Sequence, residues 1–149
     1  MGYGYGVWLV YNQNVFKDKT SHIGHITIAC FMKKDEAKNL YDDIVQNVNT
    51  KFKLTTDGIP ELFSINFYEH DKNNLCSWGF NFKSTDWPKL QTICNKYTCD
   101  FSHQPHTSVE YNSNALTFKP YYIGESNFKC KIHLVDIRSD FPDDWKIIE

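Results

Sequence analysis

The stretch Ser21-His22-Ile23-Gly24-His25-Ile26-Thr27-Ile28 occurs a second time, with changes, as Ser102-His103-Gln104-Pro105-His106-Thr107-Ser108-Val109. Both copies follow the pattern Ser-His-x-x-His-x-[Thr/Ser]-[Ile/Val], and His106 lies 81 positions after His25. In the first copy, polar and apolar residues alternate from position 25 onward, which is typical of a half-buried strand. The repeat therefore predicts two strands that carry equivalent side chains.

The rest of the sequence predicts one α+β domain over residues 1–149 with mainly antiparallel sheet. Alternating apolar residues predict strands at 5–11, 26–30, 63–67, 76–82, 106–111 and 129–138. Apolar residues at helical spacing predict a helix at 36–49 and another that starts near Thr85. The polar segment 71–74 predicts a hairpin turn. We expect two pseudo-symmetric lobes with outer helices, whose motif strands face a central cleft.

The charge of the chain argues against a long nucleic acid as partner. The formal net charge is −2, and Arg138 is the only arginine among 16 basic residues. Proteins that follow a long duplex usually carry a basic stripe, and no such stripe is visible in the sequence. We therefore expect a nucleotide or short oligonucleotide as substrate, bound by a monomer.

The cysteine content indicates a reducing compartment. The five cysteines are odd in number and form no CxxC pair, so buried free thiols in a cytoplasmic protein are expected. No signal peptide and no membrane span is evident in the sequence, and we expect no membrane association.

The repeated residues suit acid–base chemistry on a phosphate. Alternation along a strand places His25 and Thr27 on one face, and His106, Ser108 and Glu110 on one face of the second strand. One histidine would take a proton from water or a ribose hydroxyl, and the other would protonate the leaving oxygen. The two hydroxyls would donate to the phosphate oxygens, so neither a metal nor another cofactor is needed.

Two further residues are candidates for substrate binding. Glu110 would reach the cleft by alternation and orient a histidine or contact a ribose. Tyr11 ends the first predicted strand and would offer a stacking surface at the mouth of the cleft.

The paired motifs resemble those of the 2H phosphoesterase superfamily, which has the LigT-like fold. His25-Ile26-Thr27-Ile28 matches the family pattern at every position, and in the second copy Thr107 replaces the usual apolar residue. The opening segment 5–10 also resembles the first strand of cyclic phosphodiesterase members. One feature departs from many members, because only residues 12–24 lie between the first strand and the first motif, too few for a long helix.

The resemblance implies a metal-independent phosphodiesterase. Its substrate would contain a 2′,3′-cyclic phosphate or a 2′-5′ linkage, as in 2′-5′ oligoadenylate, or would be a cyclic or linear signalling oligonucleotide. The sequence leaves open whether the enzyme processes RNA ends or degrades a signalling nucleotide, and which histidine is the acid.

Two alternatives remain. His22, His25, His103 and His106 could together bind zinc in a metal-dependent hydrolase, although the hydroxyls then have no role. A protein with the same cleft could also bind a nucleotide without cleaving it.

Overall fold

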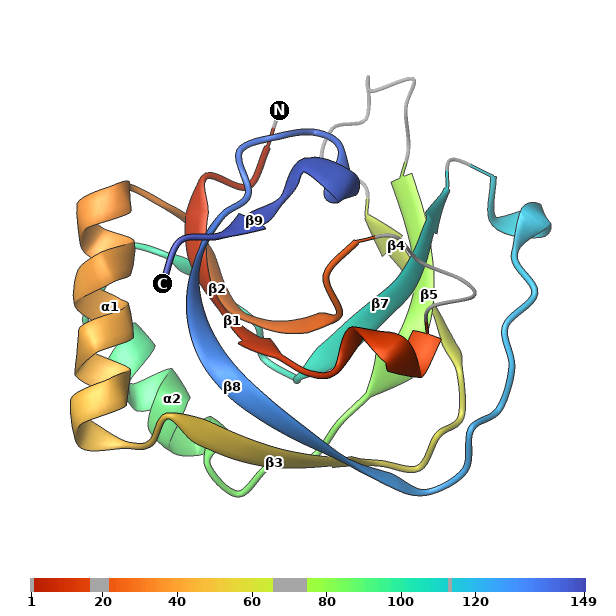
Figure 1. The fold of residues 1–149 in the computed structure, drawn as a ribbon, viewed down its shortest axis with the longest axis horizontal. Coiled ribbons are helices and arrows are strands. Elements are labelled where there is room, and N and C mark those ends of the chain that lie inside the picture. The colour runs from red at the N-terminus through yellow and green to blue at the C-terminus, as the bar shows by residue number, and fades with distance from the viewer. Residues whose placement is uncertain (1, 17–21, 66–74, 113) are drawn as a thin grey trace.

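The structure is a computed structural model that describes residues 2–16, 22–65, 75–112 and 114–149. It is an α+β fold in which two mainly antiparallel sheets curl around the core as a half-barrel (Figure 1). The predicted turn at 71–74, together with His70, lies outside the described residues.

The larger sheet contains both the first strand and the first motif strand. Its strand order is β3-β8-β1-β2-β6, with β9 added beside β8. The strands are β1 (Tyr5–Val10), β2 (His25–Met32), β3 (Lys51–Thr56), β6 (Asp100–Phe101), β8 (Ser126–Asp136) and β9 (Lys146–Ile147). The smaller sheet has the order β4-β5-β7, with β4 (Glu61–Ile65), β5 (Leu75–Asn81) and β7 (His106–Asn112). The second motif thus begins β7, in the other sheet.

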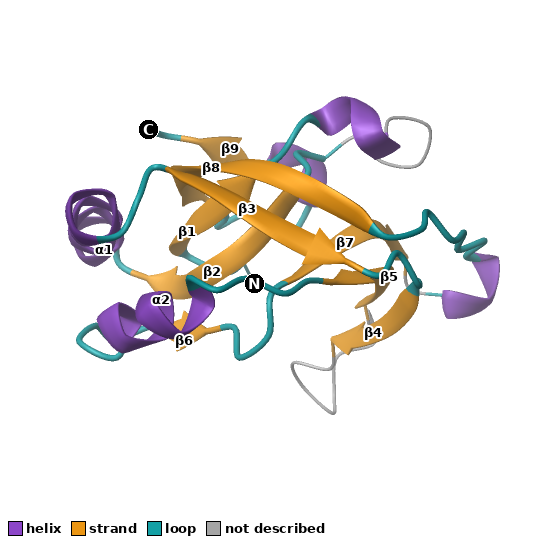
Figure 2. Cartoon of the chain, turned by 90° about the horizontal axis from the view of Figure 1, so that it is seen from below, coloured by secondary structure: helices purple, strands orange, loops and turns teal. Residues whose placement is uncertain are grey.

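Two helices lie together beside the larger sheet, on the side away from β4, β5 and β7 (Figures 1 and 2). Helix α1 (Lys34–Asn47) buries Ala37, Leu40 and Ile44, at the spacing that its sequence predicts. Helix α2 (Trp87–Cys94) has a proline in its first turn, where no intrahelical N–H is required. Three 3₁₀ turns, at Gln13–Phe16, Ala115–Thr117 and Pro142–Asp144, connect other elements. Within the described residues, no helix is both long and apolar enough to span a bilayer.

The alternation in β2 divides its side chains between two clusters. Ile26 and Ile28 enter the main core, which also receives apolar side chains from both helices and from β5. On the other face, Trp8 stands opposite Thr27 in the β1–β2 register, so their side chains share that face with His25. Trp8 belongs there to a second, smaller core. The strand therefore presents its motif side chains away from the main core.

The predicted class of fold is confirmed, and so are the positions of both long helical patterns. The segments that became β3, β6 and β9 were not predicted as strands. Strands β6 and β9 have two residues each, too few to show a period of two. Strand β3 could have been predicted, because the residues that it buries alternate with exposed ones: Phe52, Leu54 and Thr56.

Candidate active site

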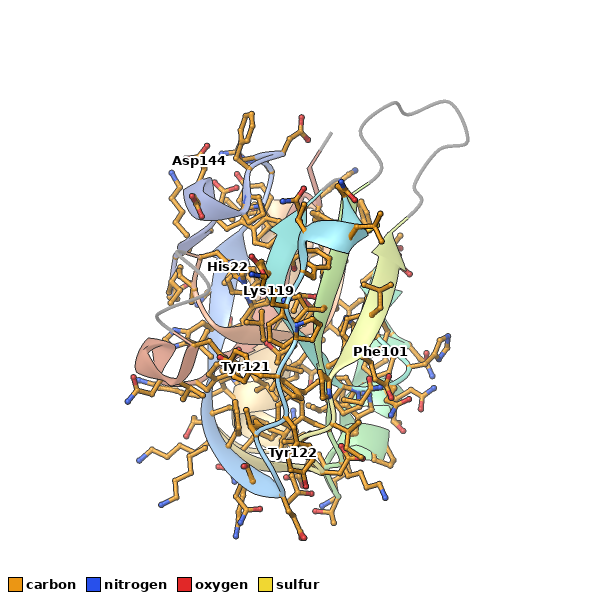
Figure 3. All side chains as sticks on the ribbon, turned by 90° about the vertical axis from the view of Figure 1, so that its right-hand side faces the viewer. His22, Phe101, Lys119, Tyr121, Tyr122 and Asp144 are labelled. Carbon is orange, nitrogen blue, oxygen red and sulfur yellow. The ribbon has the colours of Figure 1, made fainter. Side chains whose placement is uncertain are left out.

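The two copies of the motif lie side by side. β2 begins at His25 and β7 at His106, and the Oγ1 of Thr107 donates a 2.7 Å hydrogen bond to the carbonyl oxygen of His25. His22, which lies beside β7 in Figure 3, has its Nε2 3.0 Å from the carbonyl oxygen of Ser108. Because a carbonyl oxygen only accepts, His22 donates this bond. Two hydrogen bonds therefore join segments that are far apart in the sequence.

Both motif histidines are held in the same way. The Nδ1 of His25 lies 2.6 Å from the carbonyl oxygen of Ile23, and the Nδ1 of His106 lies 3.3 Å from that of Gln104. In each case the acceptor belongs to the residue two positions earlier. Since the carbonyl accepts, Nδ1 carries the proton, and Nε2 of the neutral ring is the nitrogen that can take up a proton. The repeat in sequence is thus also a repeat in side-chain geometry.

His25 is enclosed and neutral. Its ring stacks on the indole of Trp8 with a centroid distance of 3.5 Å and an interplanar angle of 9°, and only 5% of the residue is exposed. Burial, against the hydrogen bond to Ile23 and with smaller contributions from the charges of His22 and His106, lowers the pKa of His25 to about 3. His25 and His106 are therefore close enough to interact electrostatically.

His106 is more open than His25. It is half-buried, and its ring centroid lies 4.9 Å from that of Phe63 on β4. Burial lowers the pKa of His106 also, and the hydrogen bond to Gln104 opposes this effect. The two histidines thus differ in how readily each can hold a proton.

The motif hydroxyls follow the two histidines. Thr27 is half-buried on the face that carries His25. Ser108 is buried, and its Oγ lies 2.9 Å from the Oγ of Ser77, which has no exposed surface. The Tyr111 hydroxyl also bonds to Ser108, which opposes the rise in the pKa of Tyr111 to about 12 that burial causes. Ser108 is therefore held by side chains from both β5 and β7.

The sequence predicts Tyr11 at the mouth of a cleft, but the side chain lies in the main core. Its hydroxyl is 2.7 Å from the Oγ1 of Thr107, and its ring packs edge to face against Phe16 and Phe128. Only 5% of Tyr11 is exposed. Tyr11 follows Val7 and Leu9 on the inward face of β1, so it supports the second motif strand from behind.

Glu110 does not share the face of Ser108, because a β-bulge interrupts the alternation. The register of β5 with β7 passes from Gly79 opposite Ser108 to Trp78 opposite Glu110, so Val109 is the extra residue. The Glu110 carboxylate accepts a 2.8 Å hydrogen bond from the Trp78 indole. Tyr111 instead occupies the position beside Ser108 that simple alternation gives to Glu110.

Among the other histidines that the structure describes, His103 and His133 lie apart from the motif pair, whereas the ring of His22 meets that of His25 edge to face. His103 is exposed, and the Nδ1 of His133 donates to the carbonyl oxygen of Glu149 over 3.0 Å. The ring centroids of His22 and His25 are 6.0 Å apart. In the described part of the chain, no group of three or more His, Cys, Asp or Glu side chains is arranged to hold a metal ion.

Several residues around the motif were not predicted to belong to the site. The sequence could have pointed to Thr107, because this polar residue replaces the apolar one expected in the motif. Nothing in the sequence marks the other four residues, since each belongs to an ordinary apolar or mixed segment: Trp8, Ser77, Tyr111 and Trp145. They are brought to the motif by sheet register and by the path of the C-terminal segment.

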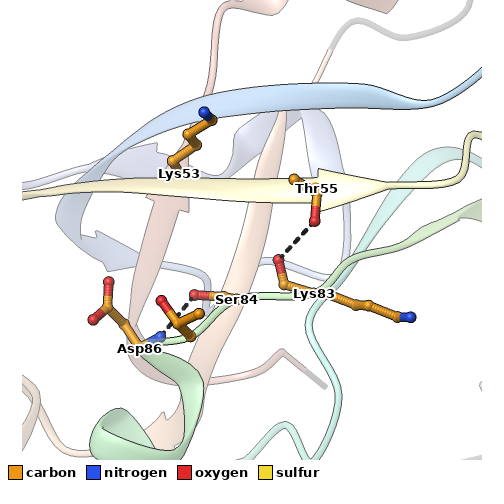
Figure 4. A pocket seen from close by; sticks show the side chains of 6 residues that line it. Lys53, Thr55, Lys83, Ser84 and Asp86 are labelled. Carbon is orange, nitrogen blue, oxygen red and sulfur yellow. Dashed lines mark hydrogen bonds between the residues drawn. The ribbon is translucent and has the colours of Figure 1, made fainter.

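A shallow groove of about 450 Å³ lies elsewhere, between β3 and the segment before α2 (Figure 4). Its lining consists of Lys53, Thr55, Lys83, Ser84, Thr85 and Asp86. Backbone hydrogen bonds in both directions between Thr55 and Lys83 form its floor. The groove contains none of the motif residues.

Comparison with known proteins gives no matching family model and no matching curated protein. The functional argument therefore rests on the geometry of the motif.

Proposed function

We propose that this protein is a metal-independent phosphodiesterase of the 2H type. The observation that carries the proposal is the matched anchoring of His25 and His106, each through Nδ1 to the carbonyl oxygen two residues earlier. Such anchoring fixes the tautomer and the orientation of a ring that must exchange protons through Nε2. His133, outside the motif, also donates through Nδ1 to a carbonyl, but that carbonyl belongs to Glu149, distant in the sequence. The anchor two residues earlier occurs at both copies of the repeated motif.

The environments of the two rings suggest a division of roles. His25 is held neutral, so it begins the reaction as the base and takes a proton from water. The hydroxide attacks phosphorus and the bond from phosphorus to the ribose oxygen breaks. His106, which enters the cycle protonated on both ring nitrogens, gives its Nε2 proton to that oxygen, and exchange with water afterwards removes the proton from His25 and restores the one on His106. Thr27 and Ser108 donate hydrogen bonds to the non-bridging oxygens, where negative charge increases. In this proposal the two sheets are the two lobes, and the phosphate lies between them.

The substrate is a small nucleotide or a short oligonucleotide. The net charge of −2 and the single arginine do not suit a duplex-binding surface. A 2′,3′-cyclic phosphate, a 2′-5′ linkage and a cyclic dinucleotide each present one phosphodiester group to the histidine pair.

The proposal is tested by incubating the protein in EDTA with 2′,3′-cyclic nucleotides, 2′-5′ oligoadenylates and cyclic dinucleotides, with products resolved by mass. We expect one class to be cleaved, with the same rate after metal is removed. Activity that is lost in EDTA and restored by zinc would contradict the two-histidine mechanism. Saturable binding without turnover on the whole panel would favour a nucleotide-binding module.

A further inference from the structure

The C-terminal segment reaches back to the motif face of the larger sheet. After β8, the chain passes through the 3₁₀ turn Pro142–Asp144 and returns to β8 as β9. Between them stands Trp145, of which 6% is exposed, in the smaller core with Trp8. This core covers the side of β2 that carries His25.

Trp145 is enclosed by four aromatic rings. Ring centroids at 5.6–5.8 Å from that of Trp145 belong to Tyr3, Trp8, His25 and Tyr111. The interplanar angles lie between 68° and 90°, so each neighbour meets the indole edge to face. The flat bicyclic indole is thus held in an aromatic box, and one wall of this box is His25, the proposed general base. A purine has the same flat bicyclic shape.

The segment that supplies Trp145 also supplies negative charge. Asp140, Asp143 and Asp144 are exposed, and the charge of Asp143 raises the pKa of His22. This carboxylate is therefore within electrostatic reach of the first motif. A nucleotide would bring the same two features to this place, a flat ring as its base and an anion as its phosphate.

The box also contains a polar atom without a partner. The indole nitrogen of Trp8 is buried and has no hydrogen-bond partner among the described residues. Buried N–H groups are almost always paired, so one without an acceptor beside a candidate catalytic residue indicates a place for a ligand atom. The ring nitrogens of a purine are acceptors of this kind, whereas the indole of Trp145 has only a donor.

We propose that residues 139–145 form an intramolecular plug, in which Trp145 occupies the site of a purine base and must leave before a nucleotide reaches His25. The identity of the ligand rests on the proposed function, but the enclosure of His25 by Trp145 does not. The plug is held largely by local bonds. The Trp145 indole donates to the Ser139 carbonyl over 2.9 Å, and the Asp144 amide donates to that of Phe141 over 3.0 Å. After the plug, β9 pairs with β8 at two positions, and Ile148 and Glu149 are joined to Leu134 by backbone hydrogen bonds.

The wild-type chain contains a matched control for this proposal. Trp87 has the same exposure as Trp145, 6%, and its indole also donates to a backbone carbonyl, that of Ser102, over 2.9 Å. Trp87 however packs in the main core. If the plug opens, hydrogen exchange at the Trp145 indole N–H, followed by NMR, should be at least about 10-fold faster than at Trp87. Adding adenosine 2′,3′-cyclic phosphate should accelerate exchange at Trp145 alone. Equal exchange at both indoles would overturn the proposal.

Substitutions at Trp145 provide the second measurement. In Trp145→Ala, diethyl pyrocarbonate should modify His25, located by peptide mass, at least about 10-fold faster than in the wild type, because local opening is no longer required. Trp145→Phe retains an aromatic ring in the box and should remain protected. Free indole should protect His25 again in Trp145→Ala, since an apolar cavity of the shape of the lost side chain binds a matching ring. Unchanged modification in a folded Trp145→Ala would overturn the plug.

Neither measurement depends on turnover, so the two proposals can fail separately. Fast exchange at Trp145 with no cleavage of any nucleotide would support the plug and argue against the proposed function. Cleavage by a protein in which Trp145 and Trp87 exchange equally would support the function and overturn the plug. If Trp145→Ala does not fold, the wild-type exchange rates alone decide.

Discussion

Thr107 connects the second motif to the first through the 2.7 Å hydrogen bond from its Oγ1 to the carbonyl oxygen of His25. Because the hydroxyl has one proton and gives it to this carbonyl, the Tyr11 hydroxyl must be the donor in its own 2.7 Å bond to Thr107. A directed chain therefore runs from Tyr11 through Thr107 to the backbone of His25. All of it is buried, so each member depends on the others for its hydrogen bonds.

Replacing Thr107 should destabilise the protein. Thr107→Val keeps the shape of the side chain but leaves the carbonyl of His25 and the hydroxyl of Tyr11 without partners. We expect the free energy of unfolding, measured in urea, to fall by about 1–3 kcal/mol. Thr92→Val is a matched control, because the Thr92 hydroxyl also donates to a carbonyl but is exposed, and it should change stability by less than about 0.5 kcal/mol.

The coupling within this chain is measurable. Tyr11→Phe removes the first donor, so its effect in the Thr107→Val background should be smaller than in the wild type, in a double-mutant cycle. Strictly additive effects would show that Tyr11 and Thr107 do not act together.

The motif histidines should dominate turnover. His25→Ala and His106→Ala should each lower kcat by roughly 10²–10⁴-fold on the substrate found in the panel, as expected for loss of a general acid or base. Thr27→Ala and Ser108→Ala should each have a smaller effect, because each removes one hydrogen bond to the phosphate. His133→Ala is the control, since its Nδ1 likewise donates to a backbone carbonyl but it lies outside the motif. Wild-type rates in both folded histidine variants would contradict the assignment.

The stability of the fold should depend on pH in the acidic range. The pKa of His25 is lowered from 6.5 to about 3, so below pH 6.5 the unfolded chain binds a proton that the folded chain does not. Stability should therefore decrease as the pH falls from about 6.5 towards 3, by at most about 1.4 kcal/mol per pH unit for this one proton. His22 and His106 are shifted in the same direction.

His25→Phe isolates the contribution of this ring. It keeps a flat ring against Trp8 but cannot titrate, so the slope of stability against pH between about 4.5 and 6 should decrease. Asp136, whose pKa is lowered by Arg138, loses its stabilising charge only at lower pH and does not affect this window. An unchanged slope would mean that His25 is not held neutral by the fold.

The sequence could predict what depends on alternation and on repetition. The side chains of β2 divide between two faces as expected, with Ile26 and Ile28 in the main core and His25 on the other face with Thr27. The burial of His25 was not expected, because it depends on Trp8 and Trp145. Glu110 was misplaced because a bulge adds one residue without any change in composition. The contact between Trp145 and His25 could not be predicted from the sequence, because it depends on how the last segment pairs with β8. The local pattern of a strand determines which side chains share a face. The register between strands and the return of the chain from distant segments determine which side chains meet in the site.

Glu110 provides a test of whether the bulge or simple alternation describes this strand in solution. Its carboxylate accepts a hydrogen bond from the Trp78 indole, and Trp78 is completely buried. Glu110→Ala should therefore lower the free energy of unfolding by about 1–3 kcal/mol, because a buried donor loses its acceptor. Glu110→Gln keeps a carbonyl acceptor in the same place. It should therefore retain most of the stability and leave the kcat/KM of the enzyme unchanged. The opposite result is a strong loss of kcat/KM in Glu110→Gln together with an unchanged urea midpoint in Glu110→Ala. It would mean that the Glu110 side chain faces the substrate and that the strand alternates without a bulge.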